Sequence, residues 1–264
     1  MDQESTIWRR IAFRVMYDGT GFLGWQRQKS GRTVQEELEK RLTRLSGNRP
    51  VTVTGAGRTD SGVHAHGQVA HADVCCRYDD GDLHHALSRM CPDDLVVYDL
   101  RTVPSDFHAR YSARRRSYRY RILLRPDPFQ VRYGWSAPAE LNRDLLAEAA
   151  GLLLGGHDFT ALSKHNPDTP NSVCTLYDAR WVEGEGHLDF HVTADRFLYG
   201  MVRLLVGVQY DVGRGARPAT DIPELIASGD RAGQSMAVPA QGLSLVHVGY
   251  DEQKFGGNSS SGLI

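Results

Sequence analysis

The sequence predicts an α+β fold and is compatible with two related halves, each a sheet with helices on one face. Segments in which apolar and polar residues alternate are separated by segments with apolar residues at helical spacing. The pattern Phe-x-Val-x-x-Asp occurs at residues 13–18 and again at residues 190–195, each time at the end of an expected strand. This short repeat is compatible with two related halves, and chance alternation explains it nearly as well. The 264 residues are enough for one large core or for two domains of ordinary size.

The first half is predicted to begin with an alternating strand that stops at Gly19. A helix follows, because Thr33 and Glu36 form a capping box, leucines continue at helical spacing, and Gly47 can end the helix. A second helix has its apolar residues on one face and stops before Pro92. The expected strands cover 11–18, 51–53 and 69–74, and the second helix covers 82–91.

The second half starts with a strongly alternating strand, residues 116–124, in which Tyr118 and Tyr120 share one face. A later helix is ended by the glycine pair 155–156. The apolar run 197–208 is interpreted as a helix or a strand-to-helix turn. The remaining expected elements are helices at 142–154 and 221–228 and strands at 188–193 and 243–248.

Composition excludes several classes of protein. Hydrophobic residues make up 41% and charged residues 24%, unlike a disordered, collagen-like or coiled-coil chain. No apolar run approaches the roughly 18 residues of a membrane helix, and the N-terminus lacks the regions of a signal peptide. The four cysteines form no C-x-x-C pair, which argues against a zinc ribbon or a thioredoxin motif and favours reduced thiols in the cytoplasm.

The net charge of −1 hides an uneven distribution of arginine. Residues 1–150 contain 23 basic and 19 acidic side chains, and the rest of the chain contains 8 and 13. Of the 31 basic residues, 27 are arginine, whose planar fork suits phosphate. A GC-rich genome explains the high arginine content, but it does not explain clusters of arginine.

The loop 55–67 has the densest set of chemically active side chains. It places Arg58, Asp60 and two histidines among glycines, which let a ligand approach the backbone closely. A carboxylate presented outward from such a loop can act as a nucleophile or a base. The alternative is a tight turn in which the aspartate caps its own backbone.

The same region allows a second hypothesis, a metal-dependent hydrolase. His64 and His66 would face the same way on a strand and could bind one ion, with Asp60, His71 and Asp73 within reach. The spacing matches no zinc signature closely. Histidines packed beside a sheet explain the pattern as well.

Residues 107–125 contain seven arginines and three tyrosines. Rings that stack on bases and arginines that reach phosphates are what an RNA surface needs. The alternative is that the arginines lie on a solvated strand face and the tyrosines lie in the core. This alternative accounts for Tyr120, but it does not explain the run of arginines at 114–116. If this segment explained the whole chain, the protein would be a non-catalytic RNA-binding module. The expected RNA contacts are Arg110, Arg114, Arg115, Arg119 and Arg121.

Two further positions stand out near the C-terminus. Arg203 interrupts the apolar run 197–208, and a buried arginine needs a charged partner. Asp60 is one candidate for that partner, and exposure of Arg203 at a helix edge is the alternative. Gly242 marks a turn that leads into a strand at Leu243. By itself this pattern indicates only that Leu243 belongs to the core.

Together these segments resemble the bacterial tRNA pseudouridine synthases that modify the anticodon stem-loop. The resemblance runs from about Phe13 to Tyr250. It departs from the family pattern at Ser61 and His66, and the polar loop 163–172 has no obvious counterpart. The motifs that carry it are Tyr-Asp-Gly-Thr-Gly-Phe-Leu-Gly-Trp-Gln-Arg-Gln, the highly specific Gly-Arg-Thr-Asp-Ser-Gly-Val-His-Ala, Phe-His-Ala-Arg-Tyr-Ser-Ala-Arg with Tyr-Arg-Tyr, Met-Val-Arg and Gln-Gly-Leu.

The resemblance implies a reaction and a role for each matching residue. Uridine at positions 38, 39 and 40 of tRNA would be isomerised to pseudouridine, with Asp60 as the nucleophile. Arg58 would help to position the RNA, and Tyr118 would stack on the target uracil. Arg203 would pair with Asp60, and Leu243 would back the pocket. The isomerisation needs no cofactor and no metal, because there is no redox change and no group enters from outside.

The resemblance also implies an architecture and an assembly. Two ferredoxin-like halves would join their antiparallel sheets, with helices on one face and a central active-site cleft. Residues 1–106 would form an N-terminal α+β domain with the catalytic loop, and 107–253 a C-terminal α+β domain with the RNA-binding and base-stacking residues. Residues 254–264 would be a disordered tail. We expect a cytoplasmic homodimer in which one tRNA touches both subunits, with no contact to membrane or DNA.

Overall fold

The structure is a computed structural model that describes residues 8–167, 169 and 171–255. Its first half contains β1 (Arg9–Tyr17), α1 (Val34–Leu45), β2 (Val53–Gly55), β3 (His64–Val74), α2 (Asp80–Met90) and β4 (Leu95–Thr102). Its second half contains β5 (Arg115–Leu123), β6 (Trp135–Ser136), α3 (Arg143–Gly151), β7 (Gly155–Asp158), β8 (Val173–Gly184), β9 (His187–Ala194), α4 (Met201–Gly213), α5 (Asp221–Ser228), β10 (Leu243–Gly249) and α6 (Glu252–Phe255). Short 3-10 helices cover Gly19–Gly21, Thr160–Leu162, Arg231–Gly233 and Ala240–Gly242.

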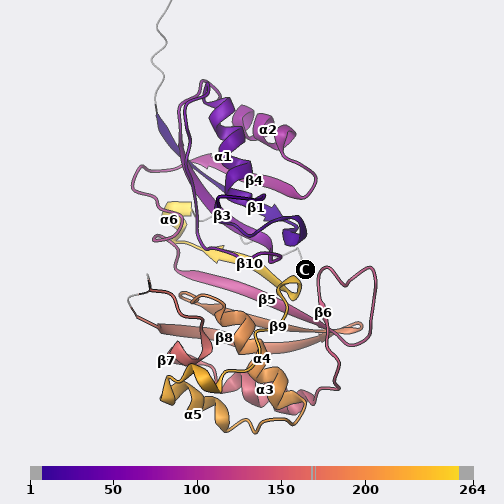
Figure 1. Cartoon of the computed structure of the whole chain (residues 1–264). Coiled ribbons are helices and arrows are strands. Elements are labelled where there is room, and N and C mark those ends of the chain that lie inside the picture. Colours follow the sequence, from indigo (N-terminus) through magenta and orange to yellow (C-terminus); the bar gives the residue numbers. More distant parts are fainter. Residues whose placement is uncertain (1–7, 168, 170, 256–264) are drawn as a thin grey trace, which may run out of the picture.

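One open sheet runs through the whole molecule (Figure 1). Its main path is β4-β1-β3-β10-β5-β9-β8-β7, while β2 pairs with β3 and β6 pairs with β5. Among the described pairs, only β10–β3 and β5–β6 are parallel. The predicted α+β fold with a large, mostly antiparallel sheet is therefore confirmed.

Each half repeats the same order of elements. The first half runs β1-α1-β2-β3-α2-β4 with the spatial order β4-β1-β3-β2, and the second runs β5-α3-β8-β9-α4-β10 with the order β10-β5-β9-β8. This is the ferredoxin-like arrangement in both halves. Because β10 pairs with both β3 and β5, the last strand of the second half also joins the two sheets.

The short repeat in the sequence aligns strands that are not equivalent. Residues 13–18 lie in and just after β1, the first strand of its half, whereas residues 190–195 lie in and just after β9, the third strand of its half. The internal duplication is thus visible in the order of elements, and the six-residue match is a coincidence of alternating strands.

Most expected elements are present, but several boundaries differ. The strand expected at 69–74 already begins at His64, because His64 and Ala65 pair with Ser244 and Leu245 of β10. The helix in the run 197–208 begins only at Met201. Strands β4 and β8 were not predicted; the alternation of β8 is interrupted by a register shift between Leu176 and Asp178. At α1, the predicted cap is confirmed, since Thr33 Oγ1 accepts the Glu36 N–H at 3.4 Å.

The expected disordered tail is wrong at its first two residues. Lys254 and Phe255 belong to α6, and the Phe255 side chain is buried against Phe107 and Tyr250. An aromatic ring so close to the end of the chain gains enough apolar burial to order its segment. The rest of the predicted tail, residues 256–264, lies outside the described residues.

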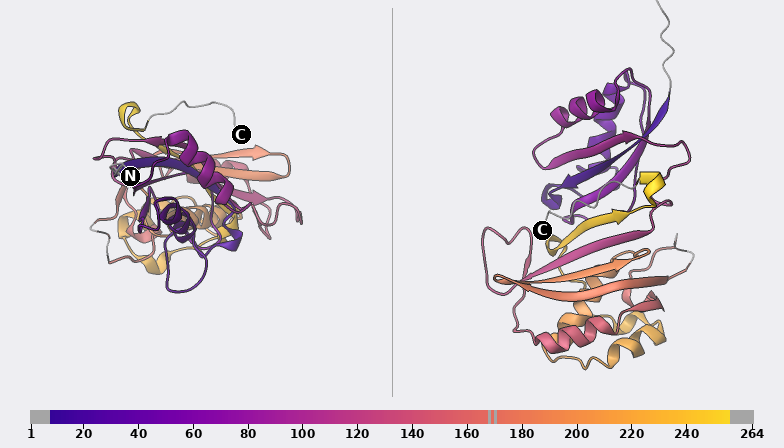
Figure 2. Two further views of the ribbon diagram at one scale, coloured as in Figure 1. Left: turned by 90° about the horizontal axis from the view of Figure 1, so that it is seen from above. Right: turned by 180° about the vertical axis from the view of Figure 1, so that it is seen from behind.

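The two halves place their helices on one face of the sheet. Seen from behind, strands β10, β5, β9 and β8 are uncovered (Figure 2). Helix α4 is almost wholly buried, with Arg203 as a partly exposed exception near its start. None of the helices in the described part of the chain is long and apolar enough to cross a membrane.

Candidate active site

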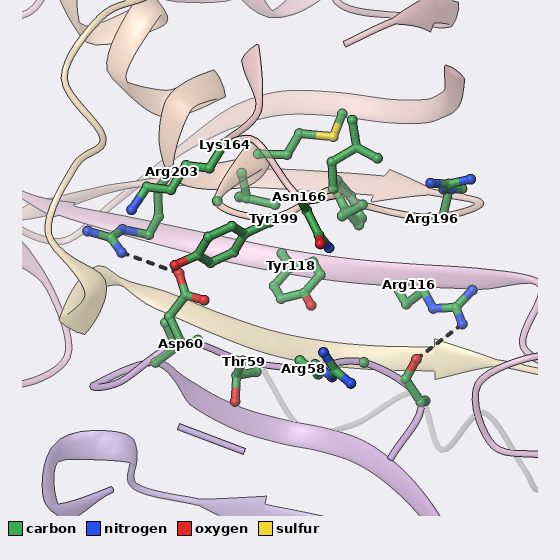
Figure 3. Close-up of a pocket in the computed structure, with 18 of the residues that line it drawn as sticks. Arg58, Thr59, Asp60, Arg116, Tyr118, Lys164, Asn166, Arg196, Tyr199 and Arg203 are labelled. Atoms are coloured by element: carbon green, nitrogen blue, oxygen red, sulfur yellow. Dashed lines mark hydrogen bonds and ion pairs between the residues drawn. The ribbon is translucent and has the colours of Figure 1, made fainter. Parts of the chain in front are cut away.

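A cleft of about 1310 Å³ opens where the two halves meet. The loop between β2 and β3 brings Asp60 to it from the first half, while β5, the start of α4 and the loop after Ser163 line it from the second. Figure 3 shows Asp60 and Arg203 toward one end of the cleft, Arg116 and Arg196 toward the other, and Tyr118 between them. The cleft therefore collects residues from segments that are far apart in the sequence.

The loop that carries Asp60 is held by the glycine-rich segment after β1. The Trp25 N–H donates to the Thr59 carbonyl at 3.0 Å, and the Ser61 hydroxyl donates to the Phe22 carbonyl at 3.3 Å. The hydroxyls of Tyr17 and Thr59 share a hydrogen bond of 2.8 Å. The opening motif of the sequence thus supports the loop that carries Asp60, a role that its residue types alone did not reveal.

Gly24 makes this support possible. Its φ is +91°, and a Cβ at this position would lie 2.6 Å from the Thr59 carbonyl oxygen. Both observations require glycine, since an L side chain disfavours this φ and would push the neighbouring backbone away. The backbone before Asp60 therefore rests directly on Gly24.

Arg203 pairs with Asp60, which decides between the two alternatives that the sequence left open. Arg203 Nη1 lies 3.4 Å from Asp60 Oδ2, and the two side chains are 17% and 28% exposed. Arg203 Nε also donates to the Val238 carbonyl at 2.6 Å, which fixes the guanidinium from the other side. This ion pair orients the Asp60 carboxylate and leaves it open to the cleft.

Tyr118 and Leu243 form the apolar part of the cleft. Tyr118 is 8% exposed, and its ring meets that of Phe197 edge to face at 5.0 Å and 84°. Burial raises the pKa of Tyr118 to about 12, so the phenol stays protonated at neutral pH. Leu243 lines the same cleft and is also buried. Phe197 was not singled out from the sequence, although it lies in the motif that contains Arg203.

The cleft is strongly cationic. Among the described residues, seven arginine or lysine side chains line it, against the two carboxylates of Asp60 and Asp195. Arg58 is exposed and makes no hydrogen bond within the described part of the chain, so it is available to a ligand. Lys164 comes from the polar loop that the sequence could not place. The cationic residues are Arg58, Arg110, Arg114, Arg116, Lys164, Arg196 and Arg203.

The arginine run 114–116 does not act as one patch. Arg114 lines the cleft and pairs with Asp251 at 3.0 Å, whereas Arg115 lies over the Tyr177 ring at 4.7 Å. Arg116 donates to four backbone carbonyls, which ties the loops around the cleft together and leaves it little capacity for a phosphate. The acceptors of Arg116 are the carbonyls of Ala56, Arg110, Ala113 and Asp195.

The other predicted RNA contacts divide between two faces of the sheet. Arg110 lines the cleft with an exposed side chain. Arg119 and Arg121 alternate with Tyr118 along β5 and therefore project from the opposite face, where Arg121 forms two hydrogen bonds to Asp189 at 2.8 and 2.7 Å. Arg115, Arg119 and Arg121 do not line the cleft.

The histidines do not assemble a metal site. His64 Nδ1 accepts the Gly19 N–H at 3.0 Å, so Nε2 carries the proton and donates to the Arg132 carbonyl at 2.9 Å. Both ring nitrogens of His64 are therefore used within the protein. In the described residues, no group of three or more His, Cys, Asp or Glu side chains could hold a metal ion. Nothing in this geometry favours a hydrolase that uses His64 and His66.

Comparisons with known proteins identify the family of this chain. The family model described as tRNA pseudouridine synthase matches residues 14–112 and 149–251. A tRNA pseudouridine synthase A of Anoxybacillus flavithermus is 38% identical over 92% of this chain and 99% of its own, and one of Chlorobium limicola is 41% identical over 92% and 100%.

One solved structure is a more distant match. The crystal structure of a Cbf5-Nop10-Gar1 complex matches 76% of this chain and 45% of its own. The TM-score is 0.36 and the sequence identity is 12%. The family model and the two tRNA pseudouridine synthases A match most of this chain. On these matches, the chain belongs to the tRNA pseudouridine synthase family.

Proposed function

We propose that this enzyme isomerises uridine to pseudouridine in the anticodon stem-loop of tRNA, at positions 38, 39 and 40, with Asp60 as the nucleophile. The observation that carries the proposal is the carboxylate of Asp60, held 3.4 Å from Arg203 in a cationic cleft beside Tyr118. In the reaction the N1–C1′ bond breaks, the base turns, and C5 bonds to C1′. The C5 proton is lost and N1 gains a proton, so the atoms balance without a co-reactant.

The surrounding residues have roles that follow from their positions. The enzyme must take the target base out of its stack, which costs a few kcal/mol. Arg58, exposed at the cleft, can fill the space that the base leaves, and Tyr118 offers a ring for the uracil. Because the pKa of Tyr118 is about 12, its hydroxyl can donate a hydrogen bond but is not a base at neutral pH. Leu243 closes the apolar side of the pocket.

We also propose that the enzyme is a cytoplasmic homodimer in which one tRNA touches both subunits, and that its functional units divide near residue 106. The family resemblance supports the dimer. Arg110 and Arg114 are placed to contact RNA in the cleft. RNA contacts by Arg115, Arg119 and Arg121 would need a second surface, away from this cleft.

Tritium release from tRNA labelled at uridine C5 tests the reaction, because isomerisation must break the C5–H bond. We expect the purified enzyme to release tritium in the presence of a chelator and without added metal. Pseudouridine mapping on the product should find the modification at positions 38 to 40. No release despite tight tRNA binding would favour the non-catalytic RNA-binding module. Release that stops with the chelator would show that the isomerisation itself depends on a metal ion, against the expectation that none is needed.

Replacing Gly24 by alanine is expected to lower kcat strongly in the same assay. The new Cβ would meet the Thr59 carbonyl oxygen at 2.6 Å and displace the backbone before Asp60. Gly215→Ala is the matched control, because its φ is +73° and nothing lies within 4 Å of the new Cβ. Urea denaturation should show a loss of at least about 1 kcal/mol for both variants. Equal kcat values in both would show that the loop does not depend on Gly24.

A further inference from the structure

The turn after Phe107 carries an exposed aromatic ring that the proposed chemistry does not use. Tyr111 is 77% exposed, yet its ring lies 4.3 Å from that of His108 at an angle of 31°. His108 in turn lies 4.7 Å from His71, a residue of β3 that is buried. Three rings therefore form a ladder that leads from the sheet to the surface.

This ladder is held rigidly. His108 Nδ1 accepts the N–H groups of Arg110 and Tyr111 at 3.2 and 3.3 Å, which fixes the ring beneath Tyr111. The Ser112 N–H donates to the His108 carbonyl at 2.8 Å and closes the turn. Burial lowers the pKa of His108 and brings that of His71 to about 4, so both imidazoles are neutral at physiological pH. The Nδ1 atom of His108 must carry no proton to accept these two backbone N–H groups.

The ladder ends in the cleft. Tyr111 lines it together with Arg110 and Arg114. Arg116 Nη2 donates to the Arg110 carbonyl at 2.6 Å, and Figure 3 places Arg116 away from Asp60, beyond Tyr118. Tyr111 therefore lies on the far side of Tyr118 from Asp60, where a neighbour of the target nucleotide would pass.

We propose that Tyr111 is a second base-stacking site, which holds an unpaired nucleobase adjacent to the target uridine in the substrate RNA. This inference rests on the proposed function. An exposed ring on a rigid support, flanked by arginines that reach phosphates, is the arrangement that proteins use for single-stranded nucleotides. Because Tyr111 lies away from Asp60, it acts on RNA affinity and on the choice of uridine, and it is not a catalytic residue.

Kinetics of Tyr111 variants test the site first. Tyr111→Ala should raise KM for tRNA about ten-fold, the size expected for one lost base–aromatic stack, with kcat nearly unchanged. Tyr111→Phe should restore the wild-type KM, because it keeps the ring. Phe129→Ala is the matched control, since Phe129 is 87% exposed but does not line the cleft. Equal KM values for wild type and Tyr111→Ala would overturn the proposal.

Binding to stem-loop RNAs with one abasic nucleotide then identifies the partner base. For wild type, one abasic position beside the target should weaken binding about ten-fold, and this loss should vanish in Tyr111→Ala. The same loss in both proteins at every position would overturn the proposal. The measurement uses affinity alone. It therefore separates a failure of this site from a failure of the proposed function, which would appear as absent tritium release by the wild type.

Discussion

Replacing Asp60 by asparagine is expected to abolish pseudouridine formation while the protein still folds and binds tRNA. Asparagine has nearly the same shape, but its amide is not a nucleophile and cannot form the ion pair with Arg203. Tritium release should show kcat reduced by at least about 10⁴-fold, the scale of a lost catalytic group. The Kd for tRNA should change far less, because the cationic side chains of the cleft remain.

A matched control exists outside the cleft. Asp221 also pairs with an arginine, at 3.6 Å from Arg217, and does not line the cleft. Asp221→Asn should therefore keep wild-type turnover. Mass spectrometry of the Asp60→Asn protein must show that the new amide is intact. Measurable turnover by such a sample would exclude Asp60 as the nucleophile.

The second large effect is expected from Arg203→Gln. Arg203 connects the Val238 carbonyl to the Asp60 carboxylate, and a shorter, neutral side chain cannot reach both. Without this contact, the carboxylate loses its orientation and the favourable field of the guanidinium. We expect kcat to fall by roughly 10²–10³-fold, as for the loss of one preorganised electrostatic contact at a reacting centre. Single-turnover tritium release would measure the chemical step directly.

Arg217→Gln is the control for this change. Arg217 has the same kinds of partner, a carbonyl at 2.9 Å and a carboxylate at 3.6 Å, but it lies outside the cleft. It should leave kcat and KM at wild-type values. If Arg203→Gln raised KM while kcat stayed unchanged, Arg203 would be an RNA contact, and its proposed role in orienting Asp60 would be wrong.

Local patterns predicted local structure well. The capping box at Thr33 started a helix in the expected place, and the helix expected at 221–228 has those bounds in the structure. The alternation at 116–124 correctly separated Tyr118 from Arg119 onto opposite faces of β5. These features depend on side chains within a few residues of one another, so one segment contains all the information that they need.

Features that depend on distant partners were predicted poorly. β3 starts five residues earlier than expected because β10, near the other end of the chain, pairs with it. β8 was missed because neighbouring strands, not its own alternation, make it a strand. The arginine run 114–116 read as one RNA patch, but folding gives its members three different sets of contacts.

The family and the loop that presents Asp60 could be recognised from the sequence because contiguous motifs identify them, and the α+β class followed from the strand and helix patterns along the chain. The tertiary structure showed that Arg203, 143 residues from Asp60 in the chain, does pair with it, and that Gly24 supports the loop that carries Asp60. It also decided which arginines reach the cleft and that Tyr111 stands on a ladder of rings. An ion pair or a stack depends on distance and burial, and these arise only when separate strands and helices pack together.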